Sequence, residues 1–153
     1  MKVLVPIDGS KYSTESIKVA SHYAKAKNAE TYLITVISSI ADIDLELSAS
    51  ERDRLLESMK ARGEELLAKA KGVCKSCGVG VVNTVLATSP SPAQEIVSFA
   101  EKEKVDLIVI GSRGMNANAR FHIGSTMASV VSNSHCCVHV VKEPCWANAG
   151  TAV

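Results

Sequence analysis

Two glycine-containing segments carry the clearest chemistry in this chain. Gly111-Ser112-Arg113-Gly114 is followed by nine residues and then by Gly124-Ser125-Thr126. An apolar, β-branched run over residues 105–110 comes directly before the first segment, and apolar residues recur at helical spacing from Met127 onward. A glycine loop between a strand and a helix lets the backbone approach phosphate oxygens, and the first amides of the helix favour anions. The pattern therefore predicts a phosphate-binding loop, and hence a bound nucleotide.

Asp8 is the second residue whose position suggests a role in binding. It ends a short apolar run over residues 3–7, which predicts a first strand. A carboxylate at the end of a parallel strand can accept ribose hydroxyls or coordinate a metal ion. The alternative is that Asp8 only shapes the turn into the first helix, because aspartate is common at such turns.

Strand-length apolar runs alternate with helical periodicity along the chain. Strands are predicted over residues 3–7, 31–37, 81–87, 105–110 and 137–141. Helices are predicted over residues 13–27, from Ser91-Pro92 to about residue 104, and after Gly124. The longest helix is predicted to begin at Ser48, which has capping-box spacing with Glu51. The buried stripe of the long second helix is expected to consist of Leu55, Leu56, Met59, Leu66, Leu67, Ala70 and Val73.

This alternation predicts an α/β fold, a doubly wound, Rossmann-like parallel sheet of five strands with helices on both faces. Ligands of such sheets bind beyond the carboxyl ends of the strands, where the winding direction reverses. Asp8 and Gly111 both follow strand ends. If their strands are neighbours, the carboxylate faces the glycine loop.

Composition narrows the classes of function. The chain has 153 residues, which suits one domain over residues 1–143 followed by a tail at 144–153 without periodicity. A net charge of +1 and 4% aromatic residues argue against a nucleic-acid or membrane partner. Five cysteines without any sign of export favour reduced thiols in the cytoplasm. Cys74 and Cys77 have the spacing of half a zinc site, but no second such pair exists, so they are interpreted as structural.

The combination of these motifs resembles the universal stress protein family. The resemblance covers residues 1–142 and rests on the Asp-ending first strand followed by the spaced glycines, G-x2-G-x9-G-S/T. It implies the strand order 3-2-1-4-5 and a homodimer through the last strand, Cys137 to Val141. It also implies membership of the ATP-binding branch, with Mg²⁺ or Mn²⁺ on the phosphates. Cys137 stands where the family often has proline, which is a local departure.

The resemblance also implies a set of binding residues. Asp8 would contact the ribose or a phosphate-bound metal, and Val36 would hold the adenine through its backbone. The glycines and hydroxyls would cradle the phosphates, where Gly114 and Gly124 are expected to supply open space and a positive φ, and Arg113 would neutralise phosphate charge. The full set is Pro6, Ile7, Asp8, Val36, Ile110, Gly111, Arg113, Gly114, Gly124, Ser125 and Thr126.

Three functions are compatible with these residues. The first is an ATP-binding regulatory protein of the stress response, a homodimer whose nucleotide state alters its interaction with unknown protein partners. The second is a slow ATP hydrolase or a nucleotidyl-transfer enzyme on the same fold. No lysine follows Gly124-Ser125, and no nucleophile with a base can be assembled, so any hydrolysis is expected to be slow. The third is an interaction module that does not bind nucleotide.

Overall fold

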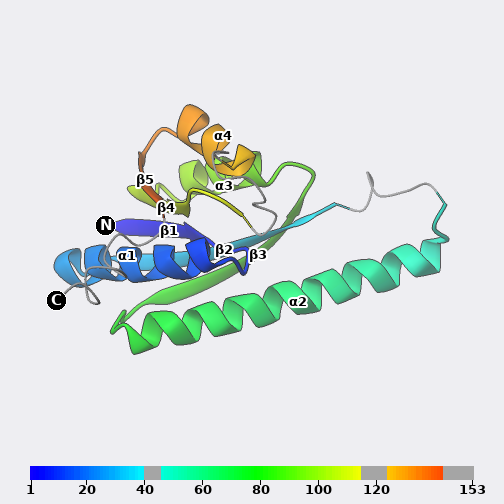
Figure 1. The fold of residues 1–153 in the computed structure, drawn as a ribbon, viewed down its shortest axis with the longest axis horizontal. Helices are drawn as coiled ribbons and strands as arrows, with labels where there is room; N and C mark the ends of the chain where they lie inside the picture. The colour runs from blue at the N-terminus through cyan, green and yellow to red at the C-terminus, as the bar shows by residue number, and fades with distance from the viewer. Residues whose placement is uncertain (40–45, 115–123, 143–153) are drawn as a thin grey trace, which may run out of the picture.

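The computed structural model describes residues 1–39, 46–114 and 124–142. Its parallel sheet has helices on both faces, and one helix, α2 (Ala49–Ser76), extends well beyond the sheet (Figure 1). The predicted tail at residues 144–153 lies outside the described residues. Within the described ranges, no helix is both long and apolar enough to cross a membrane.

Strands and helices alternate as the sequence predicted. The elements in chain order are β1 (Lys2–Pro6), α1 (Lys11–Lys27), β2 (Glu30–Ser38), α2 (Ala49–Ser76), β3 (Val82–Ser89), α3 (Pro92–Lys102), β4 (Leu107–Gly111), α4 (Ser125–Asn133) and β5 (Cys137–Val141).

The sheet has the order β3-β2-β1-β4-β5 and every pair is parallel, which confirms the predicted fold class. Alternate strand residues point to opposite faces, so the sheet divides the core into two clusters. Val5 and Val109 pack with α1 and α2 on one face, whereas Leu4 and Ile108 pack with α3 and α4 on the other. Because β1 lies between β2 and β4, the chain reverses its winding direction there.

Three helices begin with a serine cap, and two of these caps follow from the sequence. Ser48 and Glu51 form the predicted capping box of α2, and Ser91 caps α3 ahead of a proline in its first turn. The Ser10 hydroxyl accepts the Ser13 N–H, so α1 begins at Lys11 and not at Ser13 as predicted. An N-cap precedes the apolar periodicity that the prediction relied on, which explains the difference.

The predicted buried stripe of α2 is wrong for the first half of the helix. Gly63, Leu67, Ala70 and Cys74 are buried, whereas Leu55 is exposed. The first half projects beyond the sheet, so it has no strand to pack against (Figure 1). Helical periodicity shows which residues share a face but not where the neighbouring sheet ends.

Cys74 lies in the last turn of α2 and Cys77 is its C-cap residue, directly before the glycine that ends the helix. Gly78 has φ +80°, and the N–H groups of Gly78 and Val79 donate to the carbonyls of Lys75 and Cys74, as in a Schellman motif. Cys74 is 1% exposed, and burial, with Cys77 nearby, raises the pKa of its thiol to about 11. The Cys74 thiol therefore stays protonated near neutral pH and packs as a small apolar side chain.

Candidate functional site

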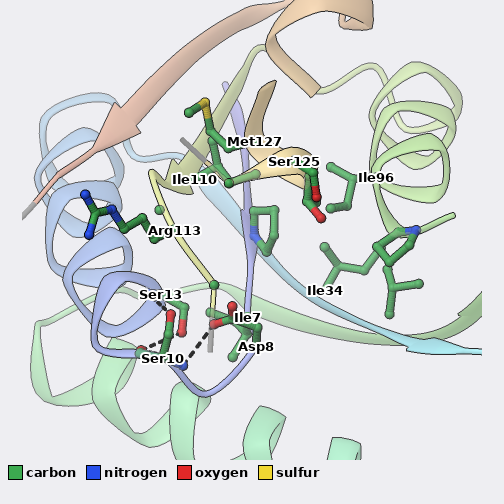
Figure 2. Close-up of a pocket in the computed structure, with 17 residues that line it drawn as sticks. Ile7, Asp8, Ser10, Ser13, Ile34, Ile96, Ile110, Arg113, Ser125 and Met127 are labelled. Carbon is green, nitrogen blue, oxygen red and sulfur yellow. Dashed lines mark hydrogen bonds between the residues drawn. The ribbon is translucent and has the colours of Figure 1, made fainter. Parts of the chain in front are cut away.

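A cavity of about 410 Å³ opens at the carboxyl ends of β1 and β4, where the winding reverses (Figure 2). All eleven residues that the sequence predicted as binding residues line this one cavity. They come from the ends of β1, β2 and β4 and from the start of α4. The topology therefore brings together residues that are more than a hundred positions apart in the chain.

Asp8 occupies the turn between β1 and α1. Its Oδ1 accepts the backbone N–H of Ser10 at 2.9 Å, so the carboxylate does shape the turn into the helix. Its Oδ2 lies beside the glycine loop, only 3.1 Å from where a Cβ on Gly114 would stand. One carboxylate oxygen is thus fixed by the turn, and the other remains at the cavity. The turn interpretation is confirmed, and the ligand role stays a prediction.

The two glycine segments meet through the backbone. The Gly124 N–H donates to the Ser112 carbonyl at 2.9 Å, and the Ser112 N–H donates to the Val141 carbonyl at 2.8 Å. A Cβ on Gly124 would lie 3.2 Å from the Ser112 oxygen. Ser112, itself buried, therefore ties the end of β4 both to the start of α4 and to β5.

The expected positive φ at Gly114 and Gly124 is wrong. Gly124 has φ −59°, and the glycines with positive φ in the described residues are Gly9 and Gly78. Glycine is needed at the cavity because a side chain there would collide with neighbouring atoms, and not because the backbone has an unusual conformation.

The first turn of α4 opens into the cavity without a side-chain cap. Gly124 takes the N-cap position and has no side chain that could accept a hydrogen bond from the first amides of the helix. The N-caps of α1, α2 and α3 are serines whose side chains do accept such bonds. Ser125, Thr126 and Met127 line the cavity at this turn. Backbone amides of this kind, at the positive end of the helix dipole, bind anions.

Part of the cavity lining is apolar. Ile34 and Ile96 lie beside Ser125, and Met127 lies beside Ile110 (Figure 2). The sequence prediction missed six lining residues, which are Ser10, Ser13, Ile34, Pro92, Ile96 and Met127. Ile34 lies two positions before Val36 on the same strand face, so strand alternation would have identified it. Pro92 begins the helix that follows β3, so the rule that ligands lie at strand ends also points to it.

Arg113 lines the cavity, but its guanidinium extends away from Asp8 and Ser125, toward α1 (Figure 2). Its predicted contact with phosphate therefore requires a different rotamer from the one in this structure.

The cavity thus combines an anion-binding helix start, a single carboxylate and an apolar wall. Among the described residues, no cluster of three or more His, Cys, Asp or Glu side chains can hold a metal ion. A divalent cation at Asp8 would therefore need oxygen ligands from a bound phosphate or from water. This combination suits a ligand with a phosphate at one end and a group that can make apolar contacts at the other.

Comparison with curated proteins shows close relatives. The chain is similar to universal stress protein MJ0531 of Methanocaldococcus jannaschii, with 39% identity over 143 residues that cover 94% of this chain and 82% of that protein. It is also similar to universal stress protein YxiE of Bacillus subtilis, with 32% identity over 92% of this chain and 98% of that protein.

Solved structures share the fold. The hypothetical protein MJ0577 superposes with a TM-score of 0.81 at 26% identity, over 94% of this chain and 96% of that one. A universal stress protein in complex with cAMP has a TM-score of 0.68 at 24% identity, over 94% of this chain and 98% of that one. The universal stress protein of Archaeoglobus fulgidus in complex with dAMP has a TM-score of 0.66 at 20% identity, over 93% and 98%.

A family model described as the universal stress protein family matches residues 1–142. The match spans nearly the whole chain and agrees with the relatives above, so the chain belongs to the universal stress protein family.

Proposed function

We propose that this protein binds ATP with Mg²⁺ (or Mn²⁺) and acts as a homodimeric regulator in the cytoplasm, where the bound nucleotide alters its interaction with protein partners in a stress response. The observation that carries the proposal is the uncapped start of α4, which faces Asp8 across a cavity with an apolar wall. Two structural neighbours solved with cAMP and dAMP support an adenine nucleotide as the ligand.

In this proposal the phosphates lie on the amides of Ser125 and Thr126, close to the three cavity glycines. The adenine lies against the apolar wall of Ile34 and Ile96, with its polar edge on the Val36 backbone. Asp8 accepts ribose hydroxyls or coordinates the cation, because its Oδ2 is not taken by the Ser10 amide. The ends of β1, β2 and β4 thus each contribute one part of the site.

Two measurements test the proposal. Mass spectrometry of the ligand released by denaturing the purified protein identifies any nucleotide that it carries. Calorimetric titration with ATP, AMP and cAMP, with and without Mg²⁺, then measures affinity. We expect ATP to bind most tightly in the presence of Mg²⁺, with a turnover well below the ~1 s⁻¹ of an ordinary enzyme. Absence of binding by all three nucleotides would leave the interaction module as the better interpretation.

Asp8 is expected to make nucleotide binding depend on Mg²⁺. Replacing Asp8 with alanine should weaken ATP binding and reduce the difference between affinities measured with and without the cation. Asp8→Asn is the matched control for the turn, because its amide oxygen can still accept the Ser10 N–H while the charge is lost. The prediction fails if either variant keeps the wild-type response to Mg²⁺ in calorimetric titrations.

The proposed dimer interface is the edge of the sheet at β5. The Ser112 N–H bonds to the Val141 carbonyl, and the bonds of a parallel pair engage alternate residues, so the backbone groups of Val138 and Val140 point away from the sheet. These groups can pair with the same strand of a second copy around a two-fold axis.

Val140→Pro is expected to yield monomers, because it removes an outward N–H without removing a bond between β4 and β5. Val140→Thr keeps both the N–H and the β-branched shape, so it should remain dimeric. Light scattering on both variants checks this. A dimeric Val140→Pro would place the interface elsewhere, with the free edge of β3 as the next position to test.

A further inference from the structure

The ladder between β1 and β2 ends in an irregular way directly beneath the cavity. The paired register of the two strands stops at Pro6 and Ile34, and the Ile7 N–H still donates to the Ile34 carbonyl at 2.8 Å. In a regular parallel ladder the next bond would run from the Val36 N–H to the Ile7 carbonyl. Within the described residues, that backbone bond is missing, and the hydroxyl of Thr35 donates to the Ile7 carbonyl at 2.9 Å instead.

The bond from the Thr35 hydroxyl, in place of one from the Val36 N–H, has a consequence for Asp8 and another for Val36. The Ile7 carbonyl belongs to the peptide group that leads into Asp8, so the Thr35 hydroxyl fixes the orientation of the backbone that carries the carboxylate. With the Ile7 carbonyl held in this orientation, the Val36 N–H makes no bond to it among the described residues, although a carbonyl oxygen can accept two hydrogen bonds. The Val36 N–H therefore has no partner in the Ile7 carbonyl and is available at the cavity, where Val36 lines the wall.

Thr35 acts from the far side of the sheet. It is 5% exposed, and its methyl group lies on the α2 side, where it would stand 3.6 Å from a Cβ on Gly63. It does not line the cavity and cannot touch a ligand there. Any effect of its hydroxyl on binding must pass through Ile7, Asp8 and Val36.

We propose that Thr35 is a positioning residue for the nucleotide site, whose hydroxyl holds the peptide group before Asp8 and keeps the Val36 amide free to bind the adenine edge. The inference rests on the proposed function, because it assigns the Val36 amide to the base. A free N–H donor complements N1 of adenine, which is an acceptor, and opposes N1 of inosine, which carries a hydrogen. Thr35 therefore contributes to the choice of base as well as to affinity.

The test compares three variants by calorimetric titration with ATP and with inosine triphosphate. Thr35→Val keeps the shape of the side chain and removes the hydroxyl. It should weaken ATP binding about 3- to 10-fold, the range for one hydrogen bond, with a smaller change for inosine triphosphate. Thr35→Ser keeps the hydroxyl and loses the methyl that faces α2. It should retain the ATP affinity within about twofold while its melting temperature falls.

Thr31→Val is the matched control. Thr31 is also buried on β2, four residues before Thr35 on the same strand face, and its hydroxyl has no hydrogen-bond partner in the described structure. Removing that hydroxyl should change neither the affinity nor the ratio of ATP to inosine triphosphate binding. If Thr35→Val does not fold, Thr35→Ala removes the same hydroxyl and takes its place.

The outcomes separate this inference from the proposed function. If the wild type binds no nucleotide, both are overturned. If the wild type binds ATP and Thr35→Val binds it equally well, only the role of Thr35 is overturned. An equal loss in Thr35→Ser and Thr35→Val would also overturn it, because packing and not the hydroxyl would then be responsible.

Discussion

Gly124→Val is expected to abolish ATP binding while the sheet and its helices remain folded. A Cβ at this position would lie 3.2 Å from the Ser112 carbonyl oxygen and 3.4 Å from Arg113 Cα. Both neighbours are backbone atoms, which cannot move aside as the end of a side chain can. The branched side chain would therefore force apart the bond between the Gly124 N–H and Ser112, and it would shift the first turn of α4. Losing charge-assisted bonds from two amides to phosphate corresponds to a loss of about 100-fold or more.

Calorimetric titration with ATP and Mg²⁺ measures this effect, and circular dichroism checks the fold. Gly80→Val is the control, because a Cβ on Gly80 meets no atom within 4 Å. Gly114→Val should resemble Gly124→Val, since its Cβ would stand 3.1 Å from Asp8 Oδ2. Wild-type affinity in the variants at both cavity glycines would show that the phosphates do not lie at this loop.

The element order could be predicted because its signals are local, whereas the strand order was implied by the resemblance to the family. Apolar runs of strand length, the capping box of Ser48 and the proline after Ser91 each report on a few neighbouring residues. The parallel sheet then follows from the alternation of strands and helices. The residues implied by the glycine motif, by Asp8 and by the resemblance line one cavity because parallel strands place their carboxyl ends at one edge of the sheet.

The features that could not be predicted depend on distances between segments that are far apart in the sequence. Helical periodicity predicted that Leu55 belongs to a buried stripe, but Leu55 is exposed. Whether a stripe is buried depends on how far the sheet extends beneath it. The glycine motif indicated close approach but gave no φ, and the structure shows that crowding by Ser112 and Asp8 is the constraint. Thr35 has no sequence signal at all, because an isolated threonine in a strand usually reflects β propensity.

The second large effect is expected at Gly111, where glycine lets α1 approach β4. A Cβ on Gly111 would stand 2.6 Å from Tyr12 Cβ and 3.2 Å from the Tyr12 carbonyl carbon. Tyr12 lies in the first turn of α1 and is 8% exposed, so neither atom can yield unless the helix itself moves. Even alanine is therefore too large at this position.

Gly111→Ala should lower the free energy of unfolding by about 1–3 kcal/mol, as expected for overpacking of a core. Gly72→Ala is the matched control. A Cβ on Gly72, within α2, meets nothing within 4 Å, so the gain in helix propensity should stabilise that variant by up to about 1 kcal/mol. Denaturant unfolding without nucleotide measures both changes and separates the packing effect from any loss of ligand. Replacing glycine with alanine should therefore lower the free energy of unfolding at position 111 and raise it at position 72. Destabilisation of similar size at both would mean that the contact with Tyr12 is not what requires glycine at position 111.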